Sequence, residues 1–159
     1  VCVRRGVLVM NVPGGNTRSA AELTLSLILA LARNIPAAVS SLKSGKWERS
    51  RFMGSELSGK VIGIVGLGRI GREVARWCQT FGMTTVGYDP VMAPDVATKA
   101  GITPVTLDEL WARSDYITLH APKTPVRAAP ALLSRAHTTA PRSRSRTVRP
   151  FHRASPCHP

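Results

Sequence analysis

The fold is decided by the stretch Lys60-Val-Ile-Gly-Ile-Val-Gly-Leu-Gly-Arg-Ile-Gly-Arg-Glu-Val-Ala-Arg-Trp77. Its opening, residues 61–65, is a short apolar and β-branched run, which is typical of a buried parallel strand. The pattern Gly66-x-Gly68-x-x-Gly71 follows at once, and residues 69–79 carry apolar side chains on one helical face. The stretch therefore predicts a strand, a tight glycine turn and a helix, in that order.

A second strand is predicted at residues 84–88, and it ends in Asp89. An acid at this place completes the pattern of a dinucleotide-binding βαβ unit, so the sequence predicts NAD as the cofactor. The Asp89 carboxylate can accept hydrogen bonds from the adenosine ribose hydroxyls, and it would repel the 2′-phosphate of NADP. The alternative is a βαβ unit whose glycines serve only a tight turn.

The three glycines have separate expected roles in this unit. Gly66 permits the turn out of the strand, Gly68 leaves the backbone open to a pyrophosphate, and Gly71 lets the helix pack closely. The start of the helix offers free N–H groups and roughly half a positive charge to the phosphates.

The chain after Asp89 continues the alternation of strands and helices. We expect a short helix at 94–100, a strand at 101–105, a helix opened by the capping box Thr106-Leu-Asp-Glu109, and a strand at 115–120. The predicted fold class is therefore α/β. It is a partial Rossmann-like, doubly wound parallel sheet, the first half of an NAD-binding domain.

The residues before the glycine motif are expected to form a strand at 7–10 and a helix at 19–33. The helix is predicted to begin with a second capping box, Ser19-Ala-Ala-Glu22. It is apolar on nearly every side, so it must be buried either between subunits or inside an ordinary core. Each buried Leu or Ile would contribute roughly 1.5–3 kcal/mol. A shorter second helix is expected at 37–44.

The last quarter of the chain differs from the rest in composition. Residues 1–120 hold fourteen Lys and Arg and all nine acidic residues, whereas residues 121–159 hold eight Lys and Arg and no acid. We predict an unstructured Arg/Pro/Ser-rich tail at 126–159. It is a translation product of another reading frame, a basic arm for nucleic acid, or an inert linker. We favour the first, because a parallel sheet cut after its fourth strand cannot cover itself.

Other kinds of site find little support in the sequence. The three Cys residues are scattered, with no zinc spacing and no disulfide framework, which favours a reducing, cytoplasmic compartment and no metal. The longest apolar run, 23–32, is too short to span a bilayer, so no membrane partner is expected. The chain opens with Val1, and we expect it to be a fragment.

Several segments together resemble the D-isomer-specific 2-hydroxyacid dehydrogenases, over residues 4 to about 125. The segments are Val9-Met-Asn-Val-Pro-Gly-Gly-Asn-Thr17, Ser19-Ala-Ala-Glu-Leu-Thr24, Gly45-Lys-Trp-Glu-Arg49, Phe52-Met-Gly-x-Glu-Leu-x-Gly-Lys60, Gly63-Ile-Val-Gly-Leu-Gly-Arg-Ile-Gly-Arg-Glu-Val74, Phe81-Gly-Met83, Gly87-Tyr-Asp-Pro90 and Ile117-Thr-Leu-His120. Within the family, the segments around Trp47 and Met53 resemble the members that act on 3-phosphoglycerate.

This resemblance implies a domain organisation and a set of cofactor contacts. Residues 1–12 would end a substrate domain, and residues 13–125 would form a partial NAD-binding domain. The implied cofactor contacts, besides Gly66, Gly68 and Gly71, are Arg69, Ile70, Asp89, Ala121 and Pro122. The family commonly has Thr-Pro where this chain has Ala121-Pro122, so a hydroxyl contact would be lost there.

The resemblance also implies substrate contacts and an oligomer. Arg49 would reach the substrate phosphate, to which a guanidinium fork is well suited, although a solvated surface Arg is the alternative. Asn16 is the second candidate for a substrate contact. The 19–33 helix would lie in the interface of a homo-oligomer.

The family reaction implied is hydride transfer between NAD and the C2 atom of 3-phosphoglycerate, which gives 3-phosphohydroxypyruvate in L-serine biosynthesis. It needs an Arg, a His and an acid from segments that this sequence lacks, so no catalytic residue is assigned and the chain alone is expected to be inactive. His120 closes a strand, and His137, His152 and His158 lie in the tail. The alternatives are a glyoxylate/hydroxypyruvate reductase and a non-catalytic, NAD-sensing interaction protein of the corepressor kind.

Overall fold

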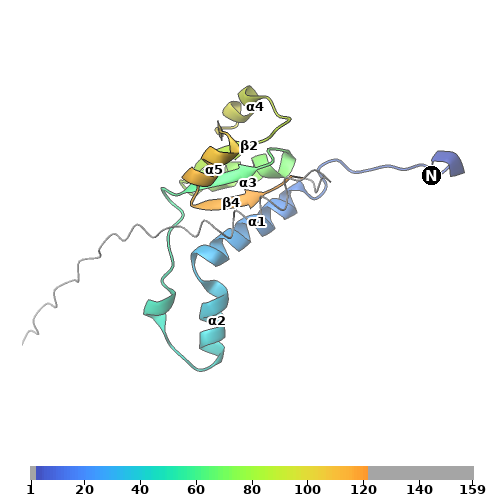
Figure 1. The fold of residues 1–159 in the computed structure, drawn as a ribbon. Coiled ribbons are helices and arrows are strands. Elements are labelled where there is room, and N and C mark those ends of the chain that lie inside the picture. The colour runs from blue at the N-terminus through green and yellow to red at the C-terminus, as the bar shows by residue number, and fades with distance from the viewer. Residues whose placement is uncertain (1–2, 122–159) are drawn as a thin grey trace, which may run out of the picture. The chain divides into compact units, whose positions relative to one another are not determined.

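The computed structural model of the chain describes residues 3–121, which belong to one compact unit, Val1–Pro122 (Figure 1). The tail expected at 126–159 lies outside the described residues.

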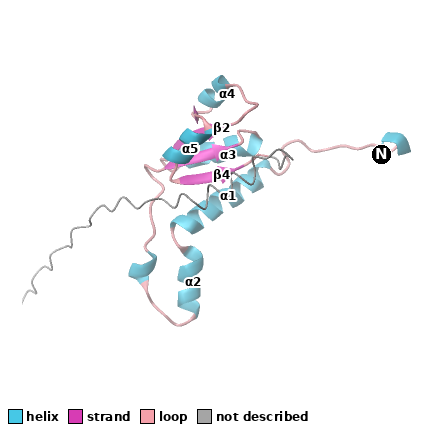
Figure 2. Ribbon diagram, viewed as in Figure 1, coloured by secondary structure: helices cyan, strands magenta, loops and turns pink. Residues whose placement is uncertain are grey.

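A four-stranded, all-parallel sheet lies at the centre of this unit (Figure 2). The strands are β1 (Val61–Val65), β2 (Thr84–Tyr88), β3 (Thr103–Pro104) and β4 (Tyr116–Leu119), in the order β3-β2-β1-β4. In the register, Val61 pairs with Thr84 on one side of β1 and Ile62 pairs with Tyr116 on the other. The predicted α/β fold and its strand alternation are confirmed; β3 and β4 are shorter than expected.

Three helices connect these strands: α3 (Arg69–Thr80), α4 (Pro94–Lys99) and α5 (Leu107–Arg113). The predicted capping box at the start of α5 is confirmed. The Glu109 backbone N–H donates to Thr106 Oγ1 at 3.3 Å, and the Thr106 N–H donates to Glu109 Oε2 at 2.8 Å. Two N–H groups at the start of the helix are thereby satisfied.

The central strand β1 is covered on both faces, which explains why it is wholly apolar, whereas the edge strand β4 leaves Ile117 37% and Leu119 46% exposed. Alternate residues of β1 point to opposite sides. Ile62 and Ile64 join the core cluster that includes Val74 of α3, whereas Val65 packs in a second cluster with Leu110 of α5. Helices on both faces are what a doubly wound sheet requires.

Two glycines in β1 and β2 let side chains from neighbouring elements pack directly against the backbone of the sheet. A Cβ on Gly63 would lie 2.7 Å from Leu110 Cδ2, and a Cβ on Gly87 would lie 2.8 Å from Cδ2 of Leu67 and from Cγ2 of Ile102. Gly63 thus lets α5 approach β1 on one face. Gly87 makes room on the opposite face for the side chain of Leu67.

Four further elements precede the sheet: η1 (Val3–Arg5), α1 (Thr17–Ala32), α2 (Ile35–Lys43) and η2 (Arg49–Phe52). α1 packs against α3 and buries Ala21 and Ala32. The Ser55 N–H donates to the Ala32 carbonyl at 2.8 Å and ties the chain after η2 to the end of α1. In Figure 1, α2 projects away from the sheet below α1.

Two local predictions in this region are wrong. Residues 7–10 form no strand, and Leu8 and Met10 are both 80% exposed, because no described strand pairs with them. The capping box Ser19–Glu22 does not form either. α1 begins at Thr17 with Asn16 as its N-cap, so Ser19 already lies in the first turn and its hydroxyl donates to the Asn16 carbonyl at 3.0 Å.

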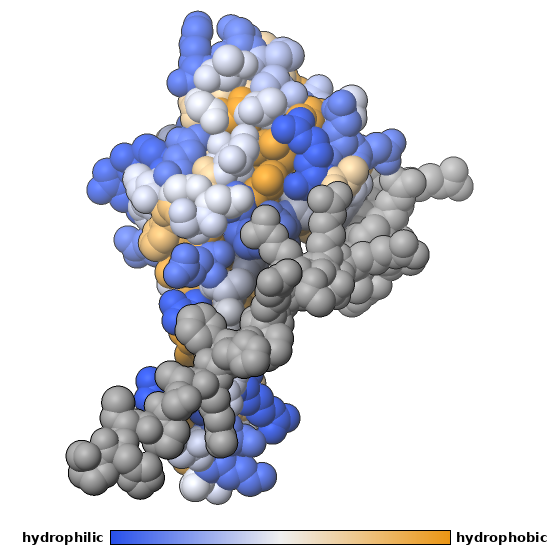
Figure 3. All heavy atoms as spheres, turned by 90° about the vertical axis from the view of Figure 1, so that its left-hand side faces the viewer, coloured by the Kyte–Doolittle hydropathy of each residue, from blue (hydrophilic) through white to orange (hydrophobic). Residues whose placement is uncertain are grey.

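One face of α1 is uncovered in the described chain. Leu23, Leu27 and Leu31 are 62%, 62% and 69% exposed, so the described residues do not bury α1 on every side. Figure 3 shows one face of the molecule, where apolar surface interrupts a mostly hydrophilic surface. Burial between subunits and burial in an ordinary core both stay predictions for this face of α1.

Candidate cofactor site

The glycine turn at the end of β1 is formed as the sequence requires. Gly66 has φ +92°, which side-chain-bearing residues rarely adopt, and its N–H donates to the Tyr88 carbonyl at 2.9 Å. A Cβ there would lie 2.7–2.8 Å from backbone atoms of His120 and Ala121. The turn is therefore held between the carboxyl ends of β2 and β4.

The other two glycines differ in their surroundings. A Cβ on Gly71 would collide with the Gly66 carbonyl oxygen, so Gly71 lets α3 pack directly on the turn. A Cβ on Gly68 would meet nothing within 4 Å. Gly68 is the N-cap of α3 and offers no side chain to the first helical N–H groups. An open space thus lies at the positive end of a helix, where a diphosphate fits.

Asp89 lies across the turn from this helix start and binds three backbone N–H groups. Its Oδ2 accepts from Leu67 at 2.8 Å, and its Oδ1 accepts from Val91 at 2.9 Å and from Met92 at 3.1 Å. Burial raises the pKa of the Asp89 carboxyl, but the three N–H groups together outweigh it, so the pKa lies below its ordinary value. The group is a carboxylate at neutral pH.

The other predicted cofactor residues lie around the same turn. Arg69 is exposed and Ile70 is half-buried in the first turn of α3, and Ala121 is exposed where its backbone touches Gly66. Pro122 lies outside the described residues. The neighbouring His120 bonds Thr118 Oγ1 through Nε2 at 3.0 Å, and burial lowers its pKa below the ordinary value.

These residues fit a dinucleotide of the NAD type. Gly68 leaves its backbone accessible, α3 supplies an uncapped amino end, and a carboxylate stands at the carboxyl end of the next strand. The Asp89 carboxylate already accepts from three N–H donors, so about one of its four lone-pair sites is left to accept from a ribose hydroxyl.

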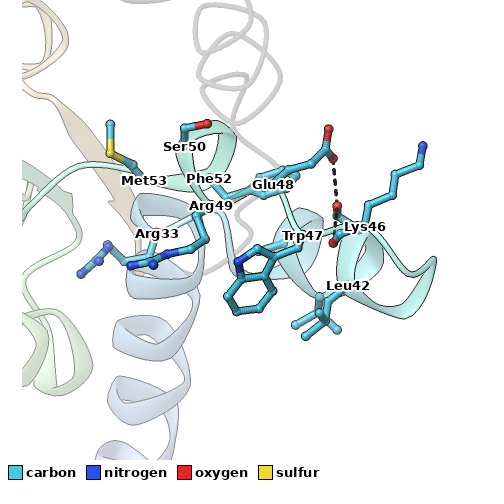
Figure 4. Close-up of a pocket in the computed structure, with 12 residues that line it drawn as sticks. Arg33, Leu42, Lys46, Trp47, Glu48, Arg49, Ser50, Phe52 and Met53 are labelled. Carbon is cyan, nitrogen blue, oxygen red and sulfur yellow. Dashed lines mark hydrogen bonds between the residues drawn. The ribbon is translucent and has the colours of Figure 1, made fainter. Parts of the chain in front are cut away.

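The two candidate substrate residues lie at opposite ends of α1. Asn16 is its N-cap, whereas Arg49 lines a hollow of about 1000 Å³ next to Arg33, the C-cap residue. The helix between them is roughly 24 Å long. Figure 4 shows Arg33 and Arg49 beside the indole of Trp47 in this hollow. The structure therefore does not bring Asn16 and Arg49 together within one chain.

The described residues offer neither a metal site nor a single membrane-spanning helix. In residues 3–121, no group of three or more His, Cys, Asp or Glu side chains could hold a metal ion. No single helix of this region is long and apolar enough to cross a membrane. α1 and α2 have that length and composition only as a pair, and the chain bends by 63° between them.

The chain matches one known protein family over the segment that contains the glycine turn. Residues 25–129 match the family described as D-isomer specific 2-hydroxyacid dehydrogenase, NAD binding domain. The chain belongs to this family. The matched domain binds NAD. The prediction of NAD as the cofactor, made from Gly66–Gly71 and Asp89, is therefore confirmed.

Curated relatives in the 2-hydroxyacid dehydrogenase family are close in sequence. The chain is 59% identical over 122 residues to D-3-phosphoglycerate dehydrogenase of Sus scrofa and 57% identical to that of Homo sapiens. It is 50% identical to the enzyme of that name from Methanocaldococcus jannaschii. Each match covers 76–77% of this chain and 23% of the relative, so the chain spans about a quarter of these proteins.

Solved structures with the same fold are similar to the chain over most of its length. A D-lactate dehydrogenase from Aquifex aeolicus, complexed with NAD and lactic acid, has a TM-score of 0.67 at 35% identity and covers 77% of this chain and 37% of its own. The pyruvate reductase of Chlamydomonas reinhardtii has a TM-score of 0.67 at 40% identity, with 78% and 36% covered.

Sequence reasoning missed two parts of the site. The bond from the Leu67 N–H to Asp89 joins residues 22 apart and involves a backbone donor, so no residue type marks it. Arg33 was interpreted only as the end of a helix, although it lines the same hollow as Arg49. The bend between α1 and α2, and the bond from the Ser55 N–H to the Ala32 carbonyl, place both Arg residues beside this hollow.

Proposed function

We propose that the chain is the NAD-binding portion of an enzyme that oxidises 3-phosphoglycerate at C2 to 3-phosphohydroxypyruvate. The observation that supports it most is the open backbone at Gly68, at the uncapped start of α3, with the Asp89 carboxylate across the turn. Gly68 and the first turn of α3 would hold the diphosphate, with Arg69 and Ile70 beside it. Asp89 would accept from the adenosine ribose, and Ala121 and Pro122 are proposed as further cofactor contacts.

When bound, NAD supplies the acceptor for a hydride, and the substrate hydroxyl loses a proton as the carbonyl forms. The one histidine of residues 3–121, His120, is held against Thr118 at the end of β4 and is given no part in that proton transfer. We therefore assign cofactor binding, and no catalytic group, to the described residues. Arg49 and Asn16 are proposed as substrate contacts from different subunits.

The choice of substrate rests on the pattern of similarity. The identity to proteins named D-3-phosphoglycerate dehydrogenase reaches 59%, against 35–40% for the solved D-lactate dehydrogenase and pyruvate reductase cited above. Those neighbours make a reductase of small 2-oxo acids, such as glyoxylate or hydroxypyruvate, the second candidate.

We further propose that the protein is a homo-oligomer in the cytoplasm and that α1 lies in the interface. The exposed stripe Leu23, Leu27 and Leu31 supports this, because burying it against a second copy removes apolar surface from water.

The test is calorimetric titration of the full chain with NADH. We expect binding by the unaltered chain and at least tenfold weaker binding by Asp89→Ala, because a charge-assisted hydrogen bond is lost. Asp95→Ala is the matched control, since this carboxylate on α4 is 67% exposed and bonds only Lys99 among the described residues. Absence of heat with NADH, or equal affinity of Asp89→Ala, would refute the proposal.

A further inference from the structure

We propose that Asp89 is a positioning residue for the diphosphate loop, acting through the backbone N–H of Leu67, in addition to any contact with ribose. This inference rests on the proposed NAD site. It states that the carboxylate fixes where the Gly66–Gly68 backbone stands before a ligand arrives. Asp89 would then govern the affinity for the phosphate part of the cofactor as well as for its sugar.

Leu67 is held from two directions. Its N–H donates to Asp89 Oδ2 at 2.8 Å, and its side chain is 2% exposed and lies over Gly87 of β2. The preceding residue, Gly66, donates to the Tyr88 carbonyl at 2.9 Å. The loop is therefore fastened to the end of β2 by two backbone donors and one buried side chain. Only one of these attachments, the bond to Asp89, uses a side chain that substitution can remove cleanly.

The Asp89 carboxylate is itself fixed in orientation. Its other oxygen, Oδ1, accepts from Val91 at 2.9 Å and from Met92 at 3.1 Å, so the group cannot turn without losing two bonds. An amide in its place could keep these two bonds through its carbonyl oxygen. Its NH₂ group would then face the Leu67 N–H, and two donors cannot bond each other. Asp89→Asn should thus release Leu67 while leaving the turn at 89–92 in place.

Electrostatics alone predicts the opposite effect on phosphate binding. A carboxylate near a diphosphate repels it, so neutralising Asp89 would strengthen the binding of any ligand that has phosphates and no ribose hydroxyls. Weaker binding of such a ligand would mean that loss of loop position outweighs relief of repulsion. The sign of the change therefore separates the positioning role from a role confined to the ribose.

The experiment pairs a ligand change with a protein change. ADP and 2′,3′-dideoxy-ADP, which lacks both ribose hydroxyls, are titrated by NMR into the full chain and into Asp89→Asn. We expect the dissociation constant of dideoxy-ADP to rise about tenfold in the variant, since the lost bond is charge-assisted. Asp95→Asn, which neutralises an exposed carboxylate on α4, should change the dissociation constant of neither ligand.

Amide hydrogen exchange supplies a readout independent of ligand. The Leu67 amide should be protected in the unaltered chain and exchange much faster in Asp89→Asn, while Val91 keeps its protection. Equal or tighter binding of dideoxy-ADP to Asp89→Asn, or an unprotected Leu67 amide in the unaltered chain, would overturn the inference. If the unaltered chain does not bind NADH, the proposed function fails; if it binds NADH and only ADP responds to the substitution, this inference alone fails.

Discussion

At the residue scale, the structure separates glycines that a sequence pattern treats alike. Gly71 is packed against the Gly66 carbonyl, whereas Gly68 faces open space. The motif could be predicted from sequence because its spacing is fixed by the turn itself. What the sequence could not reveal is the bond between Leu67 and Asp89, since a backbone N–H leaves no mark on residue identity.

This difference predicts opposite outcomes for two equal substitutions. Gly71→Ala should lower the free energy of unfolding by about 1–3 kcal/mol, because the added methyl collides with backbone. Gly68→Ala should cost less, under about 1 kcal/mol for an alanine at a helix N-cap, yet weaken NADH binding at least tenfold, because the methyl occupies the space proposed for the diphosphate. Urea denaturation and calorimetry measure the two effects. Full NADH affinity in Gly68→Ala would contradict the assigned role.

Asp89 should also give the fold a particular pH dependence. Its pKa is lowered in the folded state, so its stabilising effect is complete above the unfolded pKa of about 3.9 and is lost as the pH falls through the folded pKa. The difference in unfolding free energy between the unaltered chain and Asp89→Asn should be constant near neutral pH and shrink only below about pH 4. A difference that changes between pH 6 and 8 would contradict this.

At the scale of the element, two similar capping sequences behave differently. Thr106-x-x-Glu109 forms a capping box and Ser19-x-x-Glu22 does not, because the backbone at Asn16 starts α1 two residues earlier than expected. The bounds of β1 and β2 agree with the prediction to the residue, since β1 is an apolar run that ends at Gly66 and β2 is a β-branched and aromatic run that ends at Asp89. The strand at 7–10 was wrong because a strand needs a partner, and local sequence cannot say whether one is present.

The two capping sequences form a matched pair for a stability test. Thr106→Ala should destabilise the protein by about 1 kcal/mol, since it removes the acceptor of the Glu109 N–H. Ser19→Ala should cost far less, because the Ser19 hydroxyl only donates to the Asn16 carbonyl within an exposed helical turn. Urea denaturation compares the two, and an equal loss in both would mean that the difference in hydrogen bonding carries no energetic weight.

At the scale of the whole molecule, the strongest prediction concerns the uncovered stripe of α1. Leu27→Glu should convert an oligomer to monomers in sedimentation velocity while each subunit keeps its fold, because this side chain is 62% exposed within one chain. Val91→Glu, at a side chain that is 91% exposed outside α1, is the control and should leave the oligomer intact. A monomeric unaltered chain at micromolar concentration would remove the basis for an interface at α1.

The two glycines of β1 and β2 have a consequence for how such a chain can vary. Gly63 and Gly87 stand on neighbouring strands and admit Leu110 from one face and Leu67 from the other. A larger residue at either place would displace these side chains, and at Gly87 it would displace Leu67 of the proposed cofactor turn. When every amino acid is substituted at Gly63 and at Gly87 and the variants are selected for folded protein, glycine should be the preferred residue at both positions. Sequence changes should therefore accumulate in the outer helices, where a new binding surface can arise without a change in the proposed cofactor site.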